Sequence, residues 1–236
     1  MSWSDVPVAQ AGEAERATYL RRVLTLTLVG LGISGVTSVI SSVALAVMPG
    51  LLSGWIPMLL ILGCWAVTNF VAQPMVFGGA KIPGFLLGTV AQGVAMGFLL
   101  LAAVAVSGVA LGNPFALIGL AAGLTGFSAL GMTAYVWIAP RNFNLIGAAL
   151  SALSIPMLIV MAVGIAFPAM LGGPVGLALA GAFVLVSAGA LLYQLNAVIH
   201  RFDTSMTIEG AYTITMGILV LFWNILSLLM RLTDRR

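Results

Sequence analysis

The 236-residue sequence contains very little charge: Asp, Glu, Lys and Arg together make up 6% of it, whereas 61% of the residues are hydrophobic. A soluble domain carries about 25% charged residues. So few charges cannot cover a water-facing surface, which excludes an ordinary soluble protein and indicates an integral membrane protein in a lipid bilayer. The nine basic residues, which give a net charge of +3, are then signals of membrane orientation, and we expect no nucleic-acid partner.

Cysteine and histidine are also scarce, with Cys64 and His200 as the single examples. One cysteine excludes an intrachain disulfide, and one cysteine with one histidine cannot build a metal site. The Gly-Ile-Ser-Gly run at 32–35 matches a pattern found in intramembrane serine proteases, but that chemistry needs a base beside the serine. His200 lies at the edge of a membrane segment and Ser34 roughly midway along another, so the base is missing and we expect no enzymatic activity. We also expect no metal and no cofactor.

Long apolar runs dominate what is present. Seven of them have about the ~20 residues that a helix needs to cross the hydrocarbon core, and proline and glycine mark the connections between them. They lie at residues 23–47, 51–73, 85–108, 114–139, 143–167, 175–199 and 210–230. The sequence therefore predicts an all-α fold, a polytopic membrane bundle of seven transmembrane helices at 23–236, preceded by a cytoplasmic segment at 1–22.

Proline and glycine make further predictions about how these helices pack. Pro156 lies near the middle of the fifth segment and should kink it, because proline removes a backbone donor and clashes with the preceding turn. Gly93 with Gly97, and Gly119 with Gly123, have the small-xxx-small spacing that lets helices approach closely. We interpret both pairs as internal packing faces.

The basic residues alternate along the chain in the positive-inside pattern. Lys and Arg occur before the first segment and in every second connection, at Arg16, Arg21, Arg22, Lys81, Arg141 and Arg201. This places the N-terminus in the cytoplasm and the charge-free loop with Gly172 outside. Seven spans would place the basic C-terminus outside. Either the last segment is re-entrant, giving six spans plus a re-entrant segment, or the late positive charges are overridden. The length of 210–230 favours a full span.

Amides are the strongest polar groups inside the apolar runs, since all six acidic residues lie outside them. A polar group without a partner in hydrocarbon costs several kcal/mol. The candidates are Gln194, Asn196, Asn224, Asn69 and Gln92. Helix-to-helix hydrogen bonds would satisfy them, and a neutral polar pathway is the alternative. From helix geometry we expect Gln194 and Asn224 to lie too far apart to bond each other. Gln194 should bond Tyr212 or Thr213, and Asn224 a group on another helix.

The last two segments also carry a family resemblance. One ends in Tyr-Gln-Leu-Asn-Ala-Val-Ile-His at 193–200, and the other contains Phe-Trp-Asn-Ile-Leu at 222–226. The loop between them carries His200, Arg201, Asp203 and Glu209. Together with residues 128–136 and 141–147, these runs resemble the Bax inhibitor-1/YccA family. The resemblance implies about seven helices with the last one central. It also implies a role as a pH-sensitive calcium leak, a suppressor of cell death or, in bacteria, a modulator of the FtsH membrane protease.

The resemblance also identifies what this chain has replaced. The family leak uses two carboxylates that share a proton, and their positions correspond here to Gln194 and Leu221. An arginine that some members carry in the second helix has no match at 51–73. An amide and a leucine cannot exchange protons near neutral pH.

Two functions therefore remain for the predicted protein of a bacterial inner membrane. The first is an accessory or regulatory subunit that contacts other integral membrane proteins, such as an FtsH-type protease or a larger membrane complex. The alternative is an ion channel or transporter, resembling the calcium leak but with a neutral polar pathway.

Overall fold

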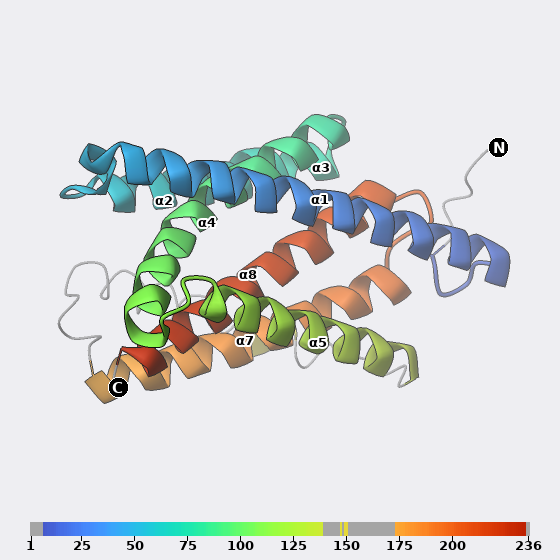
Figure 1. Ribbon diagram of the computed structural model, residues 1–236. Helices are drawn as coiled ribbons and strands as arrows, with labels where there is room; N and C mark the ends of the chain where they lie inside the picture. The colour runs from blue at the N-terminus through green and yellow to red at the C-terminus, as the bar shows by residue number, and fades with distance from the viewer. Residues whose placement is uncertain (1–6, 139–146, 148, 151–172, 235–236) are drawn as a thin grey trace. The chain divides into compact units, whose positions relative to one another are not determined.

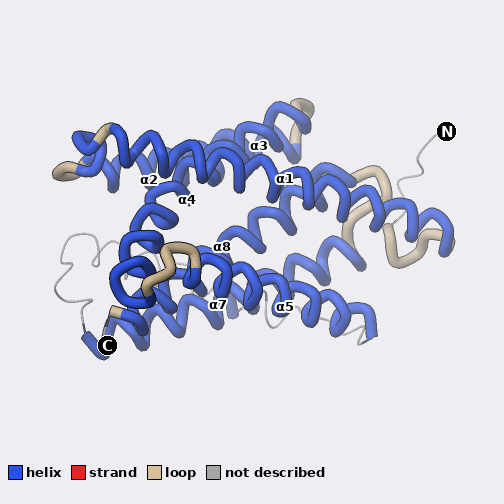
Figure 2. The backbone as a smooth tube through the Cα atoms, viewed as in Figure 1, coloured by secondary structure: helices blue, strands red, loops and turns tan. Residues whose placement is uncertain are grey.

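Helices make up nearly all of the computed structural model, which describes residues 7–138, 147, 149–150 and 173–234 (Figures 1 and 2). No strand occurs in these ranges. The helical elements are α1 (Glu13–Val47), η1 (Pro49–Leu52), α2 (Ile56–Ala66), η2 (Val67–Ala72), α3 (Gln73–Phe77), α4 (Lys81–Leu111), α5 (Ala116–Ile138), α7 (Gly173–His200) and α8 (Thr207–Thr233). The all-α prediction is confirmed for the described part of the chain.

Within those ranges, six helical stretches are long and apolar enough to cross a membrane. They are Glu13–Val47, Ile56–Phe77, Lys81–Leu111, Ala116–Ile138, Gly173–His200 and Thr207–Thr233. The fifth predicted segment, 143–167, lies outside the described residues apart from 147, 149 and 150, as do Arg141, Pro156 and Gly172. The count of seven helices and the kink at Pro156 therefore stay predictions.

Four helices, α1, α4, α7 and α8, begin earlier than the apolar pattern predicts. α1 starts at Glu13, so the polar residues before 23 form its first turns, where Glu13 and Glu15 favour the helix N-terminus. α8 starts at Thr207, with Glu209 in its first turn and only 3% exposed. The assignment of Glu209 to a loop is wrong, because an acidic residue stabilises a helix N-terminus and this one also has a cationic partner.

The described chain forms two compact units. Unit 1 comprises residues 1–102 and 196–219, and unit 2 comprises residues 103–195 and 220–236. α4, α7 and α8 each contribute residues to both units.

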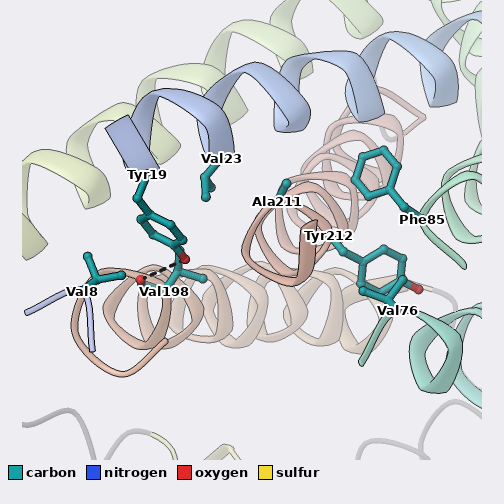
Figure 3. Packing of buried hydrophobic residues seen from close by; sticks show 8 residues of the cluster. All are labelled: Val8, Tyr19, Val23, Val76, Phe85, Val198, Ala211 and Tyr212. Atoms are coloured by element: carbon teal, nitrogen blue, oxygen red, sulfur yellow. Dashed lines mark hydrogen bonds between the residues drawn. The ribbon is translucent and has the colours of Figure 1, made fainter. Parts of the chain in front are cut away.

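The first half of α8 is the centre of unit 1. Its Gly210 approaches Tyr19 of α1 and Val198 of α7, and Tyr212 packs edge to face against Phe85 of α4 with ring centroids 6.4 Å apart. Figure 3 shows this packing. The cluster consists of Val8, Tyr19, Val23, Val76, Phe85, Val198, Ala211 and Tyr212. Within unit 1, the last helix is therefore the one around which the others pack.

Glycine and serine bring α1 and α4 into close contact. The hydroxyls of Ser34 and Ser41 on α1 donate to the carbonyls of Thr89 and Val94 on α4, at 2.9 and 3.1 Å. A Cβ on Gly93 would lie 2.7 Å from the Ser34 carbonyl oxygen, and one on Gly97 would lie 2.5 Å from Ser41. The packing role of these two glycines is confirmed. No described atom lies within 4 Å of a Cβ on Gly119 or Gly123, so their predicted packing face is not found.

A π-helical turn, η2, interrupts the second span just before Pro74. Proline cannot donate a backbone hydrogen bond, and a widened turn is one way for a helix to accommodate it. In this turn the Thr68 carbonyl accepts from the Gln73 backbone N–H and also from the Tyr212 hydroxyl, at 3.1 Å for the latter. The irregular turn thereby offers α8 a hydrogen-bond acceptor.

In unit 2, a tight connection joins α4 to α5. Gly112 adopts a φ of 66°, and the side chain of Asn113 accepts from the Phe115 backbone N–H at 3.0 Å. The Ser107 hydroxyl accepts from the Leu117 backbone N–H at 3.3 Å and donates to the Asn113 carbonyl at 2.5 Å. The predicted break between the segments at 85–108 and 114–139 is confirmed, and it lies between Leu111 and Ala116.

Substituting Gly93 tests the α1–α4 contact. We expect Gly93→Ala to lower the free energy of unfolding by about 1–3 kcal/mol, because its Cβ meets backbone rather than a movable side chain. Gly35→Ala on α1 is the control, since no described atom lies near its Cβ and alanine favours a helix. Unfolding in detergent micelles measures both. Equal stability of the two variants would contradict the packing described here.

Candidate functional site

The amides predicted as the polar centre do not form one cluster. Asn69, Gln92 and Asn196 belong to unit 1, whereas Gln194 and Asn224 belong to unit 2. The Asn69 side chain donates to the Trp65 carbonyl of its own helix at 2.8 Å. Asn196 is 3% exposed, while Gln92 is only partly buried. The structure therefore gives Asn69 a local structural role.

Gln194 is the residue that the family resemblance places at the first of the two acid positions. Its Oε1 atom is buried and has no hydrogen-bond partner among the described residues, so it accepts no bond from Asn224. The expected partners donate elsewhere: the Tyr212 hydroxyl to Thr68, and the Thr213 hydroxyl to the Glu209 carbonyl at 2.8 Å. Gln194 belongs to unit 2 and both of these residues to unit 1, so the expected bond stays a prediction.

Leu221, which the resemblance places at the second acid position, is 1% exposed. A buried leucine side chain offers neither a proton nor an oxygen ligand. In the part of the chain that the structure describes, no group of three or more His, Cys, Asp or Glu residues is placed to hold a metal ion. The two family positions therefore carry no titratable pair.

The polar centre that the sequence did not reveal is an ion pair between Lys81 and Glu209. Lys81 Nζ lies 2.6 Å from Glu209 Oε1, with Lys81 at the start of α4 and Glu209 in the first turn of α8. The Lys81 side chain is 40% exposed and that of Glu209 only 3%. The second carboxylate oxygen, Oε2, is buried without a hydrogen-bond partner among described residues. The carboxylate therefore depends on Lys81 for its compensation.

Tyr19 of α1 covers the same end of α8. Its side chain is fully buried, and its hydroxyl donates to the Val198 carbonyl at 3.5 Å. A Cβ on Gly210, the residue after Glu209, would lie 2.8 Å from the Tyr19 hydroxyl oxygen. A glycine is therefore needed beside the buried carboxylate for α1 to approach α8 this closely.

The α7–α8 turn, residues 201–206, completes this end of unit 1. Its Thr204 hydroxyl donates to Glu15 Oε1 at 3.0 Å, and Asp203 forms an antiparallel bridge with Pro7. His200 ends α7, and its Nε2 is buried with no hydrogen-bond partner in the described chain, whereas Arg201 is exposed. Two of the predicted loop residues, Arg201 and Asp203, lie in the turn, whereas His200 is the last residue of α7 and not a loop residue.

Three separate parts of the chain therefore meet at one end of unit 1, which we call the basic end: the start of α1, the start of α4 and the α7–α8 turn. Each of them carries basic residues that the sequence assigned to a single side of the membrane. The bridge from Pro7 to Asp203 and the ion pair from Lys81 to Glu209 confirm that these parts lie together.

A sequence signal for part of this end did exist. Buried positions on α1 recur every three or four residues, at Tyr19, Val23, Thr27, Gly30, Ser34 and Ser38. This stripe begins before residue 23 and predicts a helix face that continues past the apolar run. Lys81 and Glu209 had no comparable signal, because each stands alone at a segment edge and far from the other in sequence.

Chemically, the basic end is suited to holding helices together. The ion pair joins two helix starts, and the hydroxyl bonds join α1 to α7 and to the turn. The Thr204 hydroxyl donates to the Glu15 carboxylate and so ties the turn to the first turn of α1. Ser34, in the Gly-Ile-Ser-Gly run, is 1% exposed, and its hydroxyl donates a hydrogen bond to the Thr89 carbonyl.

Comparison with known proteins gives one match. A family model described as inhibitor of apoptosis-promoting Bax1 matches residues 16–234, nearly the whole chain. The searches of curated proteins and of solved structures found no match.

Removing the cation tests whether Glu209 depends on Lys81. We expect Lys81→Met to lower the free energy of unfolding by about 2 kcal/mol, less than for a fully buried pair because Lys81 is partly exposed. The control is the K81M/E209Q double variant, which leaves no charge uncompensated and should recover at least half of the loss. Unfolding of the purified variants measures the coupling, and additive effects of the two substitutions would argue against the pair.

Proposed function

Because the chain belongs to the Bax inhibitor-1 family of integral membrane proteins, we propose that it acts as a non-enzymatic accessory or regulatory subunit. It works through contacts with other integral membrane proteins, in a bacterial inner membrane. An FtsH-type protease, or a larger membrane complex, is the kind of partner that the family resemblance suggests.

The observation that carries this proposal is the chemistry at the two family acid positions. One is an amide whose oxygen is buried, and the other is a leucine that is 1% exposed. Neither can titrate near neutral pH, so the proton-sharing pair that closes the family leak has no counterpart here. A chain that keeps the family architecture without this pair still has the outer helix surfaces that can bind other membrane proteins. This favours a role that depends on such binding.

The outer surfaces of the described helices fit a protein that contacts lipid and other helices. Large apolar side chains are widely exposed, with Phe127 at 80%, Leu130 at 71% and Ile138 at 83% on α5. On α1, Val36 and Ile40 are 62% and 63% exposed. Such faces are stable only against hydrocarbon or against another membrane protein.

The partner is tested by crosslinking in the native membrane. An affinity-tagged chain, crosslinked in intact bacterial cells and purified, should carry an FtsH-type protease or a defined membrane complex in stoichiometric amount. A tagged, unrelated membrane protein of similar abundance is the control. Recovery of the protein alone, with no enriched partner, would refute the accessory role.

An ion channel or transporter is the second candidate, and one observation favours it. The Gln194 oxygen is buried without a hydrogen-bond partner among described residues, and such an oxygen is available to a water or a cation. In this reading a neutral pathway uses amides rather than acids.

Ion flux separates the two candidates. We expect the reconstituted protein to show little calcium leak into liposomes and no change in it between about pH 6 and 8, since no group at the family positions titrates there. The Q194D/L221D variant should gain a pH-dependent leak, because it restores both acids, while Q194N/L221N should not. A dye that reports calcium measures the flux, and a leak of the unmodified protein would favour the channel.

Orientation is tested by labelling single cysteines in a C64S background. Ala9 and Ser53 are both exposed and lie beyond opposite ends of α1. We expect a membrane-impermeant thiol reagent added to intact cells to label S53C and not A9C, because basic segments stay in the cytoplasm. Labelling after lysis controls for accessibility, and the reverse pattern would invert the topology.

A further inference from the structure

The residues before α1 make a contact that the family resemblance and the proposed role leave unexplained. They form a turn in which the Gln10 backbone N–H donates to the Pro7 carbonyl at 2.8 Å. The backbone N–H of Val8 points outward from this turn and donates to the Phe202 carbonyl of the α7–α8 turn at 2.9 Å. Pro7 also forms the antiparallel bridge with Asp203.

Val8 gives this contact its apolar part. Its side chain is fully buried and belongs to the same cluster as Tyr19 and Val198, beside which it lies in Figure 3. The second residue of a β-turn does not use its N–H inside the turn, so it can present both N–H and side chain to a neighbour. The α7–α8 turn therefore recognises a single residue through one main-chain acceptor and one apolar socket.

The turn at residues 7–10 is held by Val8 and by the bridge from Pro7 to Asp203. The residues that follow Val8 are exposed at Ala9 and Gln10, and Gly12 precedes α1 with no side-chain cap. α1 itself is held by its own bonds, from Thr204 to Glu15 and from Tyr19 to Val198. Release of the turn at residues 7–10 would thus leave α1 attached to α7 and to the α7–α8 turn.

We propose that the α7–α8 turn is a docking site for a polypeptide turn of a partner protein, and that residues 7–10 are its built-in occupant. The partner segment carries a valine-sized apolar side chain at the second position of a β-turn, with the N–H of that residue free to reach the Phe202 carbonyl. Binding of the partner displaces the chain's own turn. The inference extends the proposed accessory role, because it names one surface through which contact is made.

Peptide displacement on the purified full-length chain in nanodiscs tests this site. The probe is a fluorescent peptide of residues 5–12, and its binding is followed by anisotropy. The V8D chain, whose own turn has lost its apolar anchor, should bind the probe at least tenfold more tightly than the unmodified chain. A probe that itself carries V8D is the control and should not bind.

A covalent lock provides the opposite control. Residues that face each other across an antiparallel bridge have Cα atoms about 4.5–5.5 Å apart, a spacing that a disulfide spans. In a C64S background, the oxidised P7C/D203C chain holds its own turn in place and should not bind the probe. A locked chain that binds as well as the V8D chain would overturn the proposal, because binding would then occur elsewhere.

The remaining outcomes are equally decisive. If V8D is folded and binds no better than the unmodified chain, the docking site is refuted. A chain lacking residues 1–9 serves as a second variant, and if both variants fail to fold, the turn is an integral part of the structure and not a displaceable occupant. Probe binding does not require a protease, so success here with a failed crosslinking experiment would refute only the proposed partner.

Discussion

A buried carboxylate sets the main constraint on unit 1. Removing Glu209 from water is costly, and the ammonium of Lys81 at 2.6 Å is what compensates it. This fixes the start of α8 against the start of α4, since Lys81 cannot move away without leaving the buried carboxylate uncompensated. The same constraint explains the contact between Tyr19 and Gly210. Tyr19 of α1 can pack beside Glu209 only because the next residue, Gly210, has no side chain.

Hydroxyl groups contribute the second set of connections in unit 1, and they do so by reaching backbone carbonyls of other helices. Ser34 and Ser41 join α1 to α4, and Tyr212 joins α8 to the π-helical turn. Small residues permit this, because the helices must be close for a short side chain to cross between them. The unit is thus held by bonds that need close approach, and its glycines supply the room.

The sequence predicted well those features that depend on local pattern. Apolar length identified the described spans, and the spacing of Gly93 and Gly97 identified a packing face. The sequence did not predict the ion pair between Lys81 and Glu209. It also did not predict which carbonyls accept hydrogen bonds from the hydroxyls of Tyr212 and Thr213. A charged residue at the edge of an apolar segment is assigned to a loop when only the sequence is considered. The sequence pattern does not show the distant partner that makes its burial possible. The assignment of Leu221 to a family acid position depends on the family resemblance alone and stays a prediction.

The length of α1 has a consequence for where the ion pair lies. With 35 residues the helix is ~52 Å long, whereas the hydrocarbon core of a bilayer is ~30 Å thick. Even a tilted helix of this length extends beyond the core, and its polar first turns, from Glu13 to Arg22, are the part that extends. The neighbouring starts of α4 and α8 then lie at headgroup depth. Bilayer thickness and the charge of the headgroups would act directly on the pair, so the stability of unit 1 should vary with the lipid composition around it.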